Sequence, residues 1–113
     1  MQTSLYLASA ESQSGKSALA VGLLAQLCEG GGTVGIFRPV VRDESADPLI
    51  DLLLPLSTSG ADASEAIGVT YDAINEDSEK AIGTIVERYR QFAEQHDAVL
   101  VIGSDFSGVP TPT

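Results

Sequence analysis

Residues 4–17 read SLYLASAESQSGKS, a short apolar run followed by a polar turn that contains glycine. The apolar run at residues 4–9 predicts a buried strand. The turn spans residues 10–15, and from about residue 16 to residue 28 the chain is apolar on nearly every side of a helix. A helix of this kind is buried, as it is when packed on a sheet. A strand, a turn and a buried helix in this order indicate an α/β protein.

Residues 10–17, AESQSGKS, match the phosphate-binding loop (P-loop) pattern G-x-x-x-x-G-K-[ST], except that Ala10 replaces the first glycine. Gly15 lets the backbone direct its N–H groups toward a phosphate. Lys16 supplies a positive charge for phosphate oxygens, and Ser17 offers a hydroxyl group to Mg²⁺. The positive end of the following helix adds to the attraction. The sequence therefore predicts a phosphate- or nucleotide-binding site formed by Ser12, Ser14, Gly15, Lys16 and Ser17.

The rest of the chain alternates between strand and helix patterns. Glycines at residues 30–32 are expected to end the first helix, and a strand is expected at 33–41. After it we expect a short helix at 49–54 ended by Pro55, and a loop or weak helix at 57–66. A long helix capped by Asn75 or Asp77 and a strand at 98–102 complete the pattern. Asp47-Pro48 fits an N-cap followed by proline at the first helical position.

Three strands joined through helices predict a three-layer sandwich with a parallel sheet, of the P-loop NTPase-like type. Doubly wound sheets typically carry about five or more parallel strands, so we expect residues 1–113 to form the N-terminal part of a larger α/β domain. The third strand, at residues 98–102, is expected to leave an apolar edge open to a partner or a second copy.

Negative charge is concentrated after residue 42. The 113 residues carry 16 acidic and 6 basic side chains, a formal net charge of −10. Residues 1–42 contain two acidic and three basic residues, whereas residues 43–113 contain fourteen acidic and three basic ones. Nucleic acid and anionic membranes are therefore not expected as partners. A small anion bound by the first third of the chain is the expected ligand. Asp43, Glu44, Asp47 and Asp51 are expected to form a solvated face.

The single cysteine, Cys28, excludes an intrachain disulfide and is expected to be a small buried hydrophobe, which fits a reducing cytoplasm. Residues 8–10 read ASA and resemble a signal-peptidase site, but no basic residue precedes them and the apolar run is short. No stretch approaches the length of a transmembrane helix. We therefore expect a cytoplasmic protein.

Three further side chains bear on the predicted site: Arg38, Asp105 and His96. Arg38 lies at the carboxyl end of the second expected strand, where ligands of open parallel sheets bind, and is either an anion contact or a surface arginine. Asp105 follows the third strand by three residues, and either reaches a metal through water or caps a turn. His96 ends a helix, has no evident nucleophile or metal-ligand partner nearby in the sequence, and is assigned no catalytic role.

Four segments together carry a resemblance that spans the chain in order: residues 8–17 (ASAESQSGKS), 34–40 (VGIFRPV), 68–71 (GVTY) and 99–106 (VLVIGSDF). They resemble the N-terminal domain of long-form bacterial phosphate acetyltransferases, especially the actinobacterial type. That domain is similar to dethiobiotin synthetase, a P-loop α/β protein. The resemblance implies a parent enzyme that interconverts acetyl-CoA and phosphate with acetyl phosphate and CoA, through a C-terminal acetyltransferase domain that is absent from this chain.

The resemblance also implies what the present residues do. The N-terminal domain is regulatory or structural, so this chain alone is expected to be inactive, to contribute no catalytic residue and to belong to a homo-oligomer. In the dethiobiotin synthetase relatives, residues matched by Lys16 and Ser17 bind nucleotide phosphates and Mg²⁺. A substrate-contacting lysine is matched by Arg38, and a metal-binding glutamate by Ile102.

These two departures put dethiobiotin-type catalysis in doubt. Three alternatives follow. The first is a non-catalytic domain that binds Mg-ATP or another phosphate-bearing ligand, with Ser17 and Asp105 as candidate metal ligands and with the ligand contacts Ser12, Ser14, Gly15, Lys16, Ser17 and Arg38. The second is an ATP-dependent ligase like dethiobiotin synthetase, and the third is a structural interaction domain with a vestigial loop.

Overall fold

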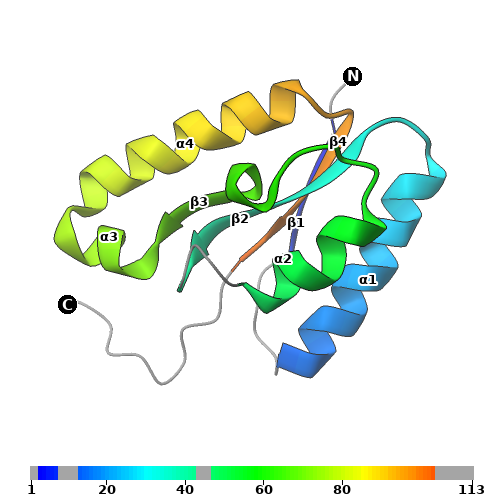
Figure 1. Cartoon of the computed structure of the whole chain (residues 1–113), viewed down its shortest axis with the longest axis horizontal. Coiled ribbons are helices and arrows are strands. Elements are labelled where there is room, and N and C mark those ends of the chain that lie inside the picture. The colour runs from blue at the N-terminus through cyan, green and yellow to red at the C-terminus, as the bar shows by residue number, and fades with distance from the viewer. Residues whose placement is uncertain (1–2, 8–12, 43–46, 104–113) are drawn as a thin grey trace.

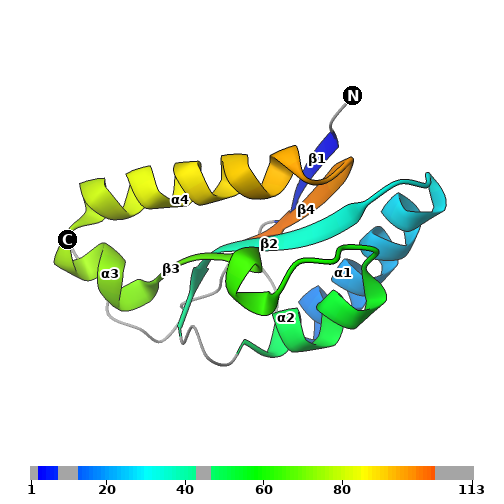
Figure 2. The same ribbon diagram turned by 45° about the horizontal axis from the view of Figure 1, so that its top comes forward.

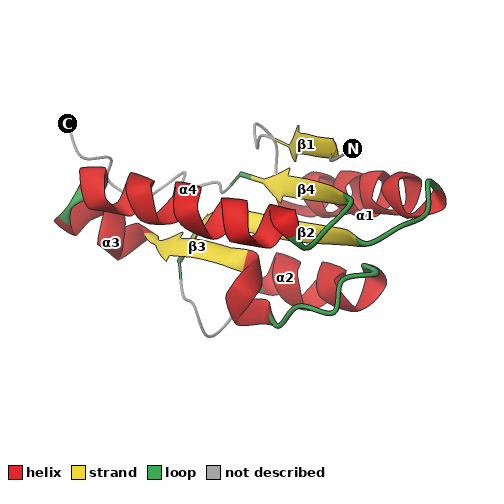
Figure 3. Cartoon of the chain, turned by 90° about the horizontal axis from the view of Figure 1, so that it is seen from above, coloured by secondary structure: helices red, strands yellow, loops and turns green. Residues whose placement is uncertain are grey.

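Parallel strands form one sheet in the order β1-β4-β2-β3 in the computed structural model, which describes residues 3–7, 13–42 and 47–103. Figure 3 shows this strand order from above. The elements in chain order are β1 (Thr3–Leu7), α1 (Gln13–Glu29), β2 (Val34–Val41), α2 (Pro48–Leu53), two short 3-10 turns (Leu54–Leu56 and Ala63–Ala66), β3 (Ile67–Thr70), α3 (Tyr71–Glu76), α4 (Ser78–Glu94) and β4 (Ala98–Ile102).

Helices cover both faces of the sheet. In Figures 1 and 2, α1 and α2 lie on one face and α4 lies on the other. The chain moves from β1 through α1 to β2, and through α2 to β3, in one direction across the sheet; it returns through α4 to β4 on the opposite face. Reversing both the direction and the face preserves handedness, so the three crossovers have the same hand, as the right-handed rule for parallel strands requires. The predicted three-layer α/β fold with a parallel sheet is confirmed.

Side chains of β2 alternate between the two helical layers. Phe37 faces α4, where its ring meets Tyr89 edge-on at 5.7 Å between centroids and Phe92 at 5.6 Å. Ile36 and Arg38 face the opposite side, because successive residues of a strand point to opposite faces. The core beneath both layers is fully apolar at its centre, with Ile36, Phe37, Leu53, Val99, Leu100 and Ile102 entirely buried.

Most expected element boundaries agree with the structure. Asp47 is the N-cap of α2 and accepts a hydrogen bond from the Ile50 N–H at 3.3 Å, with proline in the first turn as predicted. Of the two candidate caps for the long helix, Asp77 is the one used, and it accepts from the Lys80 N–H at 3.1 Å. The chain beyond α1 turns through left-handed Gly31 and Gly32, at φ 82° and 85°.

Two expectations about the sheet were wrong. Residues 67–70 form a fourth strand, β3, where no separate strand was expected. The expected third strand, now β4, is not an edge: it pairs with β1 on one side and β2 on the other. The edges of the described sheet are β1 and β3. Strand order depends on which side of the sheet the crossover α4 returns to, and local sequence does not specify that.

The structure also describes the surroundings of Cys28 and the lengths of the helices. Cys28 packs against the core but is only partly buried, whereas full burial was expected. Within the described ranges, no helix is both long enough and apolar enough to cross a bilayer.

Candidate phosphate-binding site

The candidate site lies at the edge of the sheet where the strands end. All strands are parallel, so their carboxyl ends share one edge, and the last residues of β1 and β4, Leu7 and Ile102, are direct neighbours in register. α1 begins at Gln13, shortly after β1 ends. The motif residues Gly15, Lys16 and Ser17 therefore lie in the first turns of α1 at the carboxyl edge, as the strand-loop-helix pattern predicts.

α1 begins three residues earlier than expected from the sequence. The structure has its first residue at Gln13, so the backbones of Ser14 and Gly15 belong to the helix and not to the preceding turn. Helix ends are difficult to predict because the first turn needs no intrahelical acceptor for its N–H groups and so tolerates glycine and serine. Those N–H groups and the positive helix end attract an anion, and α1 carries no acidic residue in its first turn.

Several predicted site residues are only partly covered by the structure. The backbones of Ser14, Gly15, Lys16 and Ser17 are placed in α1, while Ser12 and Asp105 lie outside the described residues. The predicted contacts of these side chains with phosphate or metal therefore stay predictions.

An apolar side chain occupies the position that the resemblance matches to a metal-binding glutamate. Ile102 is the last residue of β4 and is completely buried in the core. Isoleucine offers no oxygen to a metal ion. Within the described residues, no group of three or more His, Cys, Asp or Glu side chains is placed to hold a metal ion.

Arg38 lies inside β2 rather than at its end. The strand continues to Val41, and Arg38 is level with Ile67, the first residue of β3. The side chain is only 5% exposed, so the expectation of a surface arginine was wrong. Its Nη1 donates to both carboxylate oxygens of Asp47, at 2.9 and 3.2 Å. A charge as deeply buried as this one needs a counter-charge, and Asp47 supplies it.

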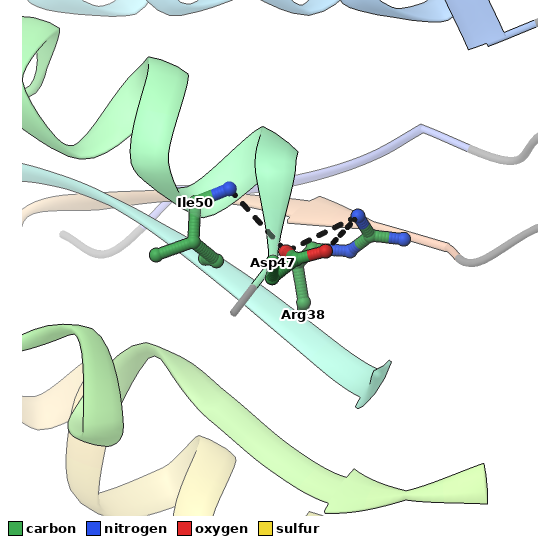
Figure 4. A network of polar contacts seen from close by, with 3 residues as sticks. All are labelled: Arg38, Asp47 and Ile50. Carbon is green, nitrogen blue, oxygen red and sulfur yellow. Dashed lines mark hydrogen bonds and ion pairs between the residues drawn. The ribbon is translucent and has the colours of Figure 1, made fainter. Parts of the chain in front are cut away.

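Asp47 has two roles that its place in an acidic segment did not reveal. Figure 4 shows its carboxylate between the Arg38 guanidinium and the backbone N–H of Ile50. One side chain thus neutralises a buried cation and caps α2. The expectation that Asp47 belongs to a solvated face was wrong, because its carboxylate pairs with Arg38 and its side chain is only 12% exposed. The Asp-Pro cap pattern was the one local indication that Asp47 has a fixed position.

His96 lies at the opposite, amino-terminal edge of the sheet, just before β4. Its ring stacks on Phe92 at 4.1 Å between centroids, and Nδ1 lies 2.6 Å from the Phe92 carbonyl oxygen. A carbonyl can only accept, so Nδ1 carries the proton. Nε2 lies 2.7 Å from the hydroxyl of Ser59, which also accepts from the Ala61 N–H. These contacts make His96 a packed structural residue that joins α4 to the loop before β3, far from the carboxyl edge.

Comparison with known proteins agrees with this architecture. A family model described as an AAA domain matches residues 3–113. A phosphate acetyltransferase of Synechocystis sp. is 31% identical over 116 residues, which cover 96% of this chain and 17% of the relative. A phosphate acetyltransferase of Nitratidesulfovibrio vulgaris is 31% identical over 118 residues, which cover 96% of this chain and 16% of the relative. The chain thus spans about one sixth of the length of these relatives. Because the model match covers nearly all of its residues, the chain belongs to this AAA domain family.

Proposed function

We propose that these residues form the N-terminal regulatory or structural part of a phosphate acetyltransferase, a cytoplasmic enzyme that interconverts acetyl-CoA and phosphate with acetyl phosphate and CoA. The observation that carries the proposal is the match to two such enzymes along 96% of this chain but only 16–17% of theirs. Most of each relative therefore lies outside the matched region, and the acetyl transfer is assigned there. In this proposal the partner of the chain is the C-terminal acetyltransferase domain, within a homo-oligomer.

The proposed role of the carboxyl edge is to bind a phosphate-bearing ligand without turning it over. The N-terminal turn of α1 offers N–H groups and no acidic side chain, and Lys16 provides a positive charge. Arg38 is the second proposed anion contact, on the same face of the sheet as α2 and held there by Asp47. Ser17 is the residue that would offer a hydroxyl to Mg²⁺, but the buried Ile102 gives such an ion no carboxylate partner. A nucleotide or other phosphate bound at this edge would therefore act as a regulator.

Calorimetry on the chain with ATP, with Mg-ATP and with inorganic phosphate as separate titrants tests the binding step. We expect at least one titrant to bind, and Lys16→Ala to weaken binding about tenfold or more, because a charge-assisted contact contributes about 1.5–3 kcal/mol. Lys80 is the only other lysine in the chain and lies on exposed helix surface, so Lys80→Ala is the matched control and should bind like the wild type. Equal weakening by both variants would mean that Lys16 acts only through net charge.

A second assay tests the non-catalytic part of the proposal. The 113-residue chain is incubated with acetyl-CoA and phosphate, and we expect no acetyl phosphate; turnover would contradict the proposal. If none of the three titrants binds, the phosphate role fails and the structural role with a vestigial loop remains. The dethiobiotin synthetase-like alternative requires Mg-ATP to bind and to be hydrolysed in the presence of a substrate amine, and the burial of Ile102 argues against it.

A further inference from the structure

Two hollows of different character border α4. An apolar groove beside this helix is lined by residues that include Phe37, Val86 and Val101, and no charged side chain lines it. The other hollow is a cavity of about 400 Å³ between α4, β3 and the turn at Ala63–Ala66, which packs against α4 (Figure 2). This volume is typical of small-molecule sites. Because α4 and α1 cover opposite faces of the sheet, the cavity is separate from the candidate phosphate site.

The floor of this cavity is apolar and fixed by its neighbours. Ile67 and Phe92 line the cavity and are only 4% and 3% exposed. The Phe92 ring stacks on His96 at 4.1 Å between centroids and lies 5.6 Å from the ring of Phe37. A ring packed in this way is already ordered, so a ligand that contacts it has little ordering cost to offset. The floor therefore suits an aliphatic or aromatic group.

A cation lines the cavity above this floor. Arg88 of α4 donates from Nη1 to the Gly68 carbonyl at 2.9 Å, which holds the guanidinium against β3. The guanidinium has further N–H donors, in a planar arrangement that matches the two oxygens of a carboxylate. Arg88 forms no ion pair with any acidic residue that the structure describes. Its charge is therefore available to a ligand in the cavity.

A carboxylate lines the same cavity. Oε1 of Glu65 accepts from the Asp62 N–H at 3.0 Å, which fixes this side chain on the turn before β3. Glu65 and Arg88, both among the described residues, form no ion pair with each other. The hydroxyl of Ser64 and the side-chain amides of Gln91 and Gln95 add polar groups to the lining. Two opposite charges that line one cavity without pairing match a ligand that carries both charges itself.

We propose that the cavity binds a free α-amino acid with an apolar side chain. The carboxylate of the amino acid pairs with Arg88 and its ammonium group with Glu65. Its side chain lies against Ile67 and Phe92. A zwitterion has no net charge, so the formal net charge of −10 does not repel it as it repels an anion. A ligand with a single charge leaves either Glu65 or Arg88 desolvated without a counter-charge.

An NMR titration of the isotope-labelled 113-residue chain compares three probes of similar size. They are L-phenylalanine, 3-phenylpropionate, which lacks the ammonium group, and phenethylamine, which lacks the carboxylate. We expect L-phenylalanine to shift the backbone amide signals of Glu65, Ile67 and Gln91 with a Kd of about 1–10 mM, as suits a ligand of this size. Each analogue should bind about tenfold more weakly or worse, because one charged partner is lost.

Two results of this titration would overturn the proposal. One is an analogue that binds as tightly as L-phenylalanine, since one of the two charges would then contribute nothing. The other is the absence of any shift at Glu65, Ile67 and Gln91 with L-phenylalanine or L-leucine at about 50 mM. The comparison uses the wild-type chain alone, so it decides the proposal even where a variant loosens β3.

Variants that remove one charge test Arg88 and Glu65 separately. Arg88→Gln and Glu65→Gln should each weaken L-phenylalanine binding about tenfold or more, and glutamine at residue 65 keeps an oxygen for the Asp62 N–H. Arg90→Gln and Glu79→Gln are the matched controls, because both residues are exposed on α4 and do not line the cavity. The controls should bind within about twofold of the wild type. Equal weakening by a variant and its control would contradict the proposal.

Competition with inorganic phosphate separates this proposal from the proposed function. The amino-acid site uses no residue of the phosphate site, so phosphate should leave L-phenylalanine binding unchanged. Displacement of L-phenylalanine by phosphate would mean that the cavity is an anion site, and would overturn the proposal. Failure of ATP and phosphate to bind, with L-phenylalanine still bound, would contradict the proposed phosphate role alone.

Discussion

At the scale of single residues, one carboxylate organises the region beside the candidate site. Asp47 pairs with Arg38, and the side chains of the pair are only 12% and 6% exposed respectively. The same carboxylate caps α2. Removing either partner leaves the other charge buried without a counter-charge, which destabilises the fold. Replacing both residues with uncharged ones leaves no buried charge to neutralise. The pair therefore fixes where Arg38 and the start of α2 lie relative to each other.

Asp47→Ser should destabilise the fold by about 3 kcal/mol, because serine keeps a capping oxygen but leaves the Arg38 charge without its carboxylate. Arg38→Met should also destabilise, while the double variant should lie within about 1.5 kcal/mol of the wild type. Urea denaturation of the four proteins measures the coupling, which we expect to be at least about 1 kcal/mol. Additive effects of the two substitutions would show that the ion pair does not connect these residues energetically.

At the scale of elements, β3 depends on a close approach between two backbones. Gly68 lies against Pro39 of β2, and a Cβ atom at residue 68 would overlap the Pro39 carbonyl oxygen. Backbone cannot move aside as a flexible side chain does. A strand of only four residues with a glycine inside has weak β-propensity, so tertiary contact with β2 is what makes it a strand.

Gly68→Ala should therefore destabilise the protein by about 1–3 kcal/mol, the usual cost of overpacking. Gly83 offers the matched control, since it lies inside α4 with open space around its missing side chain. Gly83→Ala should stabilise by roughly 0.5–1 kcal/mol through helix propensity. Thermal and urea unfolding of both variants check these signs. A neutral Gly68→Ala would show that β3 moves away from Pro39 at little cost.

At the scale of the whole molecule, repulsion among the negative charges destabilises the folded state. The formal net charge is −10, and both α3 and α4 end in an acidic residue, Glu76 and Glu94, where the helix dipole favours a cation. Self-repulsion destabilises the compact state more than the expanded unfolded chain, and salt screens it over about 10 Å at 0.1 M. Stability should therefore rise with ionic strength.

Tm measured in phosphate-free buffer should increase between low salt and 0.3 M NaCl, and about 1 kcal/mol of stabilisation corresponds to roughly 4–8 °C. Glu76→Gln combined with Glu94→Gln should raise Tm at low salt and reduce the response to salt, because two unfavourably placed charges are gone. A Tm that falls with added NaCl would mean that surface ion pairs outweigh the net repulsion.

The candidate site was predictable to the extent that it is local. Residues 10–17 carry the motif in consecutive positions, so the order of strand, loop and helix follows from sequence spacing, although α1 begins three residues earlier than expected. The burial of Arg38 and its pairing with Asp47 were not predictable, because nine positions separate the two and only the tertiary structure brings them together. The resemblance matched Ile102 to a metal-binding glutamate of the dethiobiotin synthetase relatives, but the complete burial of this side chain is known only from the tertiary structure.

Periodicity, capping and turn chemistry act over a few residues, so the α/β class, the parallel sheet, the helix caps and the phosphate-loop motif could be predicted from the amino-acid sequence. The position of β4 between β1 and β2, the additional strand at residues 67–70 and the apolar groove beside α4 became visible in the folded structure. Those features depend on which distant segments bury their apolar faces against each other. The hydrophobic effect is non-directional, so the apolar pattern of one segment does not specify which other segment it packs against.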